Sequence, residues 1–504
     1  SSVKTIEREA FANCASLVSV VFENLGASGT LTIGDRAFLN CEQLESITLP
    51  ARLTEISLQR YDELRVDTFE SIDELTEQSA DAFLGCDNLA SVNVAASASA
   101  TYTSEDGVLI KNNTLIYFPS GKIADGYTFP AVVRSIGAGA FLRHPNSNGG
   151  ISGELKIPAR ITSVGAFAFM GCNITSLIFE GGEDALSKVT IGEFAFYGSD
   201  IETLTFGEKS KVSEIGANAF ANCADLETVT IPATMESIGD NAFSESGLTS
   251  IVLTGDASKK ITLTLGSALF YGCELDELNL PANASIAADF LSGATVGNVT
   301  VADGNDFIAS EGNGLYLKAS DGSLETFLLY IPSTENPETE FMFAYYDDEG
   351  NVEKDEEGNV KVINVRNIAA SAFAGNDTLE KVVIPSSVIT IGDEAFSGSE
   401  LKILEFAQGG TEKLDIGYKA FYNMTYEEYD YDEYDYVEKS IESIILPDRP
   451  ITIGDYAFAE NARVKTIDLG GTTTVGDYAF NKTGYSNDNE GTELIITPTV
   501  ETIG

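Results

Sequence analysis

Hydrophobic positions recur along this chain with a period of about two dozen residues, and one copy is complete at residues 215–238. A phenylalanine, usually preceded by alanine, stands in each copy, as at Phe220 and Phe243. In most copies Ile, Val or Leu lies five residues before it, followed by Gly and often by Asp. We interpret the Phe as the side chain that fills the interior of a stacked repeat. The Asp is of a type that caps a short helical turn carrying the Ala-Phe pair.

A segment of alternating hydrophobicity follows each Phe and often ends in proline, as in Leu226 to Pro232. Alternation with period two indicates a strand with one buried face. One copy is too small to bury that face alone, so stacked copies pair their strands in parallel. The pattern therefore predicts an α/β repeat, a single curved solenoid of parallel strands and short helical turns over residues 1–504.

The consensus I-G-x-x-A-F-x-x-C-x-x-L-x-x-I-x-I-P-x-x-V resembles the BspA-like leucine-rich repeat family of bacterial surface proteins. The resemblance extends over nearly the whole chain in about fifteen copies. It implies a leucine-rich-repeat solenoid and an exported, extracellular or cell-surface protein that takes part in adhesion and protein binding. The family motif is structural, so it implies no catalytic site and no particular functional residue.

Three segments interrupt the period. Residues 95–135 hold the turn dipeptide Asp106-Gly107 between strand-like runs, which predicts a β-hairpin insert. Residues 301–367 have the same style and add an acidic arm with two Gly-Asn turns, which predicts a second hairpin insert. Residues 425–438 form an acidic, tyrosine-rich stretch that we expect to be a loop.

The charge narrows the classes of partner. The chain has 78 Asp and Glu against 30 Lys and Arg, a net charge of −48. A polyanion repels nucleic acid and anionic membranes, so we expect no nucleic-acid partner. The charge serves either solubility alone or attraction to a basic protein or a divalent cation.

No apolar run is long enough to span a membrane, and no export signal opens the chain. Both ends fall inside repeats, so we expect the native caps to lie beyond them.

Residues that could carry chemistry are few. All six cysteines stand three residues after the Phe, where other copies place Ser, Asn or Thr. We interpret them as buried free thiols, and disulfides between neighbouring repeats are the open alternative. The sole histidine, His144, opens a loop rich in Asn, Ser and Gly and is interpreted as a turn residue. No phosphate-binding, dinucleotide or metalloprotease motif occurs. We therefore predict no enzyme and no cofactor.

Two sets of residues are candidates for binding. The outward strand positions would align along one face of the coil, and their mixed polar and aliphatic character suits protein contact. They are Thr48, Asn93, Ile178, Thr205, Thr230, Asn279, Glu405 and Asp468. The second set is a candidate interaction loop, Tyr426, Tyr429, Tyr431, Tyr434 and Tyr436. Its tyrosines offer contact area and its carboxylates attract a basic partner or calcium, although EF-hand spacing is missing. For both sets the alternative is a merely solvated surface.

The function predicted is a non-catalytic scaffold, on the cell surface or secreted, for protein–protein interaction and adhesion to host or neighbouring cells. The alternative is a surface glycan-binding component, which clustered exposed tyrosines would favour. A pocket of convergent carboxylates with perturbed pKa values would instead favour an enzyme. The partner, the anchoring mode and the oligomeric state stay open.

Overall fold

The structure is a computed structural model. It describes residues 3–58, 79–142, 149–182, 188–256, 258, 261–331, 339–347, 351–430, 435–484 and 492–504, without the side chains of 427–430 and 435–439. The chain divides into two compact units, where the repeat pattern alone predicts one continuous solenoid. The first unit holds residues 1–275 with 293–295, and the second holds 276–292 with 296–504.

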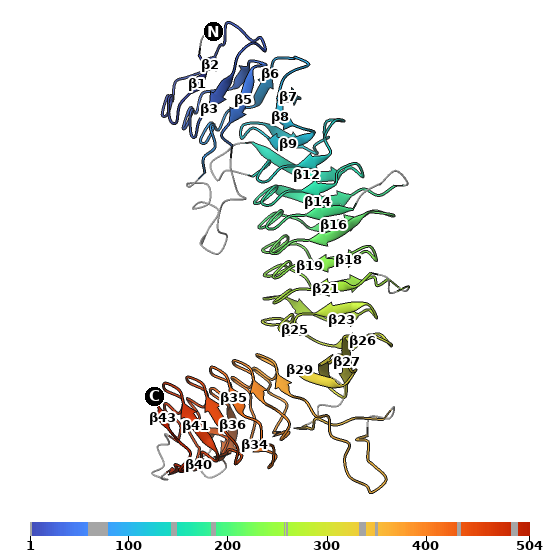
Figure 1. Cartoon of the computed structure of the whole chain (residues 1–504), viewed down its shortest axis with the longest axis vertical. Coiled ribbons are helices and arrows are strands. Elements are labelled where there is room, and N and C mark those ends of the chain that lie inside the picture. Colours follow the sequence, from blue (N-terminus) through green and yellow to red (C-terminus); the bar gives the residue numbers. More distant parts are fainter. Residues whose placement is uncertain are drawn as a thin grey trace. The chain divides into compact units, whose positions relative to one another are not determined.

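Within each unit the repeats contribute strands to two parallel ladders, which Figure 1 shows as stacked strands. Strands that precede the Phe form the first ladder, and strands that follow it form the second ladder.

In the first unit, the first ladder contains β1 (Thr5–Ile6), β3 (Leu31–Ile33), β5 (Leu53–Ile56), β11 (Ser135–Ile136), β13 (Ser163–Val164), β15 (Val189–Ile191), β17 (Val212–Ile215), β19 (Ser237–Ile238) and β21 (Leu263–Leu265). The second contains β2 (Ser19–Val20), β4 (Ser46–Leu49), β6 (Ser91–Val94), β10 (Ile123–Asp125), β12 (Gly150–Ile157), β14 (Asn173–Phe179), β16 (Thr203–Phe206), β18 (Thr228–Ile231) and β20 (Ser250–Leu253).

In the second unit, the first ladder contains β29 (Leu324–Tyr330), β31 (Asn367–Ile368), β33 (Thr390–Ile391), β35 (Leu414–Ile416), β39 (Ile451–Ile453), β41 (Thr472–Val475) and β43 (Thr502–Ile503). The second contains β23 (Glu277–Leu280), β26 (Val299–Val301), β30 (Glu340–Phe341), β32 (Lys381–Ile384), β34 (Ile403–Phe406), β38 (Ser443–Ile445), β40 (Thr466–Asp468) and β42 (Glu493–Ile495). Three further short strands are β24 (Ala284–Ile286) in this unit, β22 (Glu274–Leu275) in the first unit, and β25 (Thr295–Val296) at the boundary.

The first ladder was not expected from the sequence, because alternation predicts only the strand after the Phe. Its strands are two to four residues long in most repeats, too short to show a period. They pair because the aliphatic residue before the glycine stacks on its equivalent, as Ile215 does on Ile238. The glycine that follows allows the neighbouring backbone to approach. A Cβ on Gly216 would lie 2.7 Å from the Glu193 nitrogen.

The prediction of short helical turns is wrong, because the described residues that carry Ala-Phe form turns and no helix. An α-helix bonds each N–H back along its own chain. Here the N–H groups of Asn218 and Phe220 instead donate to the carbonyls of Asp240 and Ala242 in the next repeat, at 2.9 and 2.8 Å. Asn218 adopts a φ of 55°, in the left-handed region, which turns these groups towards the neighbour.

The Asp that recurs after the glycine caps a neighbouring repeat and not a helix of its own. Asp240 Oδ1 accepts a hydrogen bond of 2.7 Å from the Ser267 N–H, one repeat further along. Asp393 and Tyr418 in the second unit repeat the arrangement at 2.7 Å. Capping therefore joins consecutive repeats.

Stacked phenylalanines form the core of both units. Phe196 and Phe220 lie 5.2 Å apart with nearly parallel rings in the first unit. Phe373 and Phe396 lie 4.6 Å apart in the second. Each ring is almost fully buried, so the stack removes a large apolar surface from water.

In most repeats the position three residues after the Phe holds a hydrogen-bond donor. Cys223 Sγ lies 3.3 Å from the Phe196 carbonyl of the preceding repeat, and Ser199 Oγ lies 2.9 Å from that of Phe169. Asn461 Nδ2 makes the equivalent bond to Phe421 at 2.8 Å. The shared donor explains why Cys, Ser, Asn and Thr alternate at this position in the sequence. All six cysteines are free thiols, buried except for Cys14.

Both long inserts enter the first ladder. In the first unit β7 (Tyr102–Glu105), β8 (Val108–Lys111) and β9 (Thr114–Tyr117) form an antiparallel meander, and β9 then pairs in parallel with β11. In the second unit β27 (Ile308–Glu311), β28 (Gly314–Lys318) and β29 do the same ahead of β31.

The acidic arm follows in the second unit, with antiparallel bridges that include Ala344 to Val362 and Lys354 to Val360. Its base contributes Phe341 and Phe343 to the core.

Candidate functional site

The outward strand positions lie on the accessible side of the second ladder. In the first unit Thr48 pairs with Asn93, and Ile178 pairs with Thr205. Thr230 lies one strand beyond Thr205, on β18. All five side chains are half-buried or exposed, whereas their strand neighbours point into the core. Consecutive repeats therefore present one side chain each, in register, to solvent.

The second unit carries the other three positions on separate sheets. Asn279 pairs with Thr300 on β23 and β26. Glu405 lies on β34, and Asp468 lies on β40 beside Ile445 of β38. The eight predicted residues thus do not form one uninterrupted row, because the second ladder is broken in several places.

One break in the second ladder leaves a hollow. β34 ends the sheet β30-β32-β34, and β38 ends the sheet β38-β40-β42. The first ladder continues past this point, because β35 pairs directly with β39. The hollow has a volume of about 630 Å³ and is lined by Lys402, Ile403, Leu404, Glu405, Phe406, Gln408, Tyr426, Glu442, Ser443 and Ile445.

The chain segment that spans this break is the acidic tyrosine-rich stretch. It was expected to be a loop, and it is an antiparallel hairpin of β36 (Thr425–Asp430) and β37 (Asp435–Ser440). Tyr426 at its base lines the hollow, and Lys402 Nζ lies 5.5 Å from the centre of its ring. Tyr429 and Tyr436 face each other across the two strands in backbone register. Tyr431 and Tyr434 lie outside the described residues.

A comparable break in the first unit is filled. β6 ends the sheet β2-β4-β6, and the turn between β7 and β8 lies against its free edge. The Val92 N–H donates to the Gly107 carbonyl at 2.8 Å, and the Val94 N–H donates to Ser104 Oγ at 2.8 Å. The first insert therefore satisfies the free edge of β6. The equivalent edge in the second unit is that of β34, which does not pair with β38.

Exposed tyrosines gather on the turns of the second unit, a feature that the sequence reading did not locate. Tyr418 is 42% exposed and Tyr478 is 61% exposed, with Tyr456 between them. Tyr456 and Tyr478 stack at 5.1 Å with an interplanar angle of 18°. Tyr418 meets Tyr456 edge-on at 6.1 Å. Stacking covers one face of Tyr456 and of Tyr478, and both residues stay partly exposed. The signal in the sequence was Tyr two or three residues before the Phe in consecutive copies.

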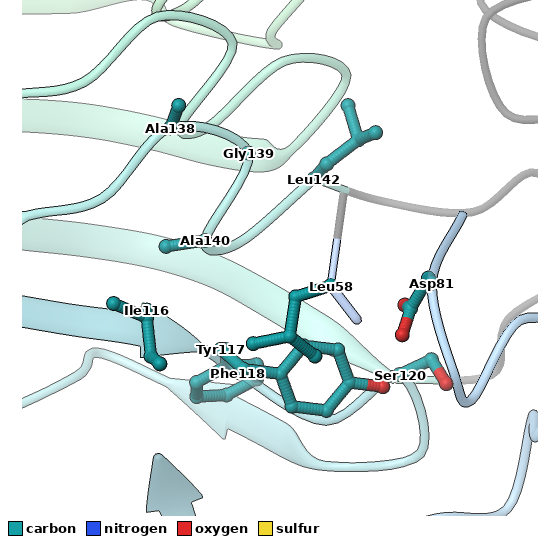
Figure 2. A pocket seen from close by; sticks show the side chains of 10 residues that line it. All are labelled: Leu58, Asp81, Ile116, Tyr117, Phe118, Ser120, Ala138, Gly139, Ala140 and Leu142. Carbon is teal, nitrogen blue, oxygen red and sulfur yellow. The ribbon is translucent and has the colours of Figure 1, made fainter. Parts of the chain in front are cut away.

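A small cavity in the first unit holds a carboxyl with a perturbed pKa (Figure 2). Asp81 is almost fully buried, and burial raises its pKa to about 7. Its Oδ1 accepts a hydrogen bond of 3.0 Å from the Phe83 N–H. Figure 2 shows Asp81 on the same side as Ser120 and the Tyr117 hydroxyl. The volume of about 10 Å³ suits a single water and not a substrate.

The buried thiols also have little chemical reactivity where they lie. Burial raises the pKa of Cys223 to about 12 and also raises that of Cys41 and Cys273. A thiol held protonated is a poor nucleophile and a poor metal ligand. Among the described residues, no cluster of three or more His, Cys, Asp and Glu side chains is placed to hold a metal ion. His144 lies outside the described residues.

The paired ladders, the stacked phenylalanines and the repeat period define a leucine-rich-repeat solenoid. The family model "BspA type Leucine rich repeat region" matches six times, at residues 1–106, 118–188, 134–264, 185–295, 366–438 and 430–496. The chain belongs to this family, as its consensus predicts. No helix among the described residues has the length and apolarity needed to cross a lipid bilayer.

Solved structures of bacterial leucine-rich-repeat proteins are similar to this chain. A leucine rich cell surface protein from Faecalibacterium prausnitzii A2-165 is 21% identical with a TM-score of 0.53, over 80% of this chain and 96% of that one. The pneumococcal vaccine antigen PcpA is 18% identical with a TM-score of 0.48, over 80% of this chain and 92% of that one. The first likeness supports the fold. No curated protein sequence matches the chain.

Proposed function

We propose that this chain is a non-catalytic scaffold, displayed on the cell surface or secreted, that binds proteins and serves adhesion to host or neighbouring cells. The observation that carries the proposal is the accessible face of the second ladder. Successive strands there present Ile178, Thr205, Thr230 and Val252 at equivalent positions. A mixed polar and aliphatic surface of this kind is typical of protein interfaces.

Two further features support the extracellular and protein-binding parts of the proposal. The Faecalibacterium protein of similar fold is described as a cell surface protein. The net charge of −48 favours a basic partner and accelerates its association at low ionic strength.

Glycan binding is the second candidate, and the exposed tyrosines at Tyr418, Tyr456 and Tyr478 favour it. Sugar rings bind to free aromatic faces, and here Tyr456 and Tyr478 cover one face of each other. This geometry favours binding of a protein over binding of a glycan, because the parts of the tyrosines that stay exposed suit polar protein contacts.

Binding arrays test the proposal. The purified chain is applied to arrays of extracellular-matrix proteins, cell-surface proteins and glycans, with calcium and with a chelator. Saturable binding to proteins that weakens at high salt is the expected result. Binding to glycans alone would favour the glycan-binding function instead. The absence of binding on every array would contradict both functions. Loss of binding in the chelator would assign calcium a role.

A further inference from the structure

We propose that three tyrosines on the turns of the second unit, which we call the tyrosine column, bind arginine side chains of a partner protein. They are Tyr418, Tyr456 and Tyr478. The proposal rests on the proposed function of protein binding and names a site for it and the side chains bound. A guanidinium group stacks on aromatic rings and pairs with carboxylates, and both kinds of group lie together on these turns.

The turns that carry the tyrosine column are held in register by backbone hydrogen bonds. The Lys419 N–H donates to the Asp455 carbonyl at 3.0 Å. The Tyr456 N–H donates to the Asp477 carbonyl, also at 3.0 Å. The rings of Tyr456 and Tyr478 then stack at 5.1 Å. The rings have fixed places in the free chain, so little ordering is needed when a partner binds.

Two of the tyrosines occupy a backbone conformation that disfavours bulky side chains. Tyr456 and Tyr478 both have a φ of 56°, in the left-handed region. Two copies of the first unit place Asn218 and Asn241 at this position. Asn adopts the left-handed conformation more easily than an aromatic residue does. Strain of this kind is often linked to function.

The first unit shows how burial offsets the same strain. Phe167 stands at the equivalent position with a φ of 57°, and it is buried in an apolar cluster with Leu142 and Met170. Tyr456 is only half-buried, and Tyr478 is 61% exposed. Burial therefore accounts for the aromatic residue in the first unit more fully than for the two tyrosines, and contact with a partner would supply the rest.

Carboxylates flank the tyrosine column. Asp455 and Asp477 directly precede Tyr456 and Tyr478, and both carboxylates are exposed. Asp455 accepts the Asp477 N–H through Oδ1 at 2.8 Å, which leaves its Oδ2 for another donor. An arginine that stacks on a ring of the column could therefore donate to a carboxylate beside it.

The balance of charge on these turns favours a cation over an anion. Lys482 is paired with Glu460 at 2.9 Å and so adds no net charge. Five carboxylates and two lysines lie on the turns of four consecutive repeats, at residues 393–394, 418–422, 455–460 and 477–482. This surface therefore attracts a basic partner and repels a second copy of the chain, whose net charge is also −48.

A lysine of the chain itself shows that a cation binds at one end of the column. Lys419 Nζ lies 5.2 Å from the centre of the Tyr418 ring and 5.0 Å from that of Tyr422. A hydrogen bond with Tyr418 raises the pKa of Lys419, which favours the ammonium form. Among the described residues, no lysine or arginine lies over the ring of Tyr456 or Tyr478. A partner's arginine would take that place.

The experiment measures peptide binding to the full chain by fluorescence anisotropy at physiological ionic strength. The probe is a fluorescein-labelled peptide of four Gly-Arg pairs. The control peptide has lysine in place of each arginine, which keeps the charge but stacks less well on aromatic rings. We expect the arginine peptide to bind about tenfold more tightly than the lysine peptide. Equal affinity would mean charge attraction alone and would overturn the proposal.

Three variants locate the site. The double variant Tyr456→Leu/Tyr478→Leu keeps apolar side chains and removes both rings, so it should lose the preference for arginine. Tyr456→Phe/Tyr478→Phe keeps the rings and should retain the preference. Tyr271→Leu is the matched control, because Tyr271 is 48% exposed outside the column, and it should leave binding unchanged. Loss of the preference in the phenylalanine variant as well would assign binding to the hydroxyls and overturn the proposal.

The outcomes separate this inference from the proposed function. Array proteins that still bind Tyr456→Leu/Tyr478→Leu would retain the scaffold and refute the arginine site. Glycans that bind the native chain and not this variant would assign the column to a glycan and overturn the proposal. An arginine preference lost only in the leucine variant would support it. The two peptides are compared on the native chain first, so that result stays decisive even if the leucine variant unfolds.

Discussion

Two of the breaks in the second ladder, one from each unit, differ in what lies against the free strand edge. At β6 the first insert lays the turn between β7 and β8 against the free edge, and Gly107 and Ser104 accept its N–H groups. At β34 the hairpin β36–β37 satisfies its own backbone and leaves a hollow of about 630 Å³. Each segment interrupts a repeat, yet only the first insert bonds to the free strand edge beside it.

The difference shows that an insertion keeps the edge of a sheet satisfied only if its own groups bond to that edge. The first insert buries Tyr102, Leu109 and Leu115 against the core as it closes the edge. The second segment has seven acidic residues and only one aliphatic residue, Val437, between Tyr426 and Lys439. Such a segment has little aliphatic surface to bury, so it does not pack against the core as the first insert does.

The largest predicted effect is on the free energy of unfolding and concerns Asp81. Its carboxyl lines the small cavity beside Tyr117 of the first insert. The folded chain raises the pKa of Asp81 from 3.8 to about 7. Between these values the folded state keeps a proton that the unfolded state loses, so stability falls as pH rises from about 4 to 7. The full loss is on the order of 4 kcal/mol. Asp81→Asn should remove this slope and should exceed the wild type in stability at pH 8, as measured by urea denaturation at pH 5 and 8. An unchanged slope would show that Asp81 does not titrate as described.

The next effect tests the turn that closes β6. Gly107 has a φ of 73°, and a Cβ there would lie 2.7 Å from the Ser91 Cβ. Gly107→Val should therefore destabilise the first unit by about 3 kcal/mol, from strain and overpacking. Gly198→Ala is the control, because Gly198 has a φ of 62° with no atom near its Cβ, and it should cost about 1 kcal/mol. Equal costs would mean that closing the edge adds no constraint.

A smaller effect is expected at the base of the hairpin. Asn461 donates to the carbonyls of Phe421 and Phe458 at 2.8 and 2.7 Å and accepts the Met424 N–H at 3.0 Å. Asn461→Ala leaves these buried groups without partners and should cost about 2 kcal/mol. Ser199→Ala, at the same repeat position without a hairpin, should cost about 1 kcal/mol. Thermal denaturation of both variants checks the difference, and a costlier Ser199→Ala would contradict it.

The smallest effect is at the rim of the hollow. Lys402 pairs with Glu380 at 2.6 Å, and both side chains are more than 40% exposed. Lys402→Ala should change stability by less than about 1 kcal/mol, because exposed ion pairs contribute little. A larger loss in thermal denaturation would show that the ion pair at the rim contributes to the stability of the fold.

The repeat could be predicted from the sequence because its period is carried by large apolar residues. Phe220, Phe243 and their equivalents mark each turn, and their stacking follows from the spacing. The turns could not be predicted as non-helical, because Asn218 bonds to the next repeat and no local propensity shows that. The same holds for Asp240, whose partner is Ser267 and not its own turn.

The candidate site was predicted only in its parts. Alternation located Thr205 and Glu405 on the accessible face, because side-chain direction has a period of two. The hollow between β34 and β38 depends on whether residues 425–440 pair with the ladder or with themselves. Both arrangements are compatible with the same alternation of side chains along residues 425–440, so the sequence does not predict which of them forms.

Amide hydrogen exchange on the full chain tests the central claim that one break is filled and the other open. The N–H groups to compare are those of Val92 and Val94 on β6 and of Leu404 and Phe406 on β34. The account predicts slow exchange for the first pair, which is bound by the first insert, and fast exchange for the second pair, which faces the hollow. Equal protection of the two pairs would contradict it.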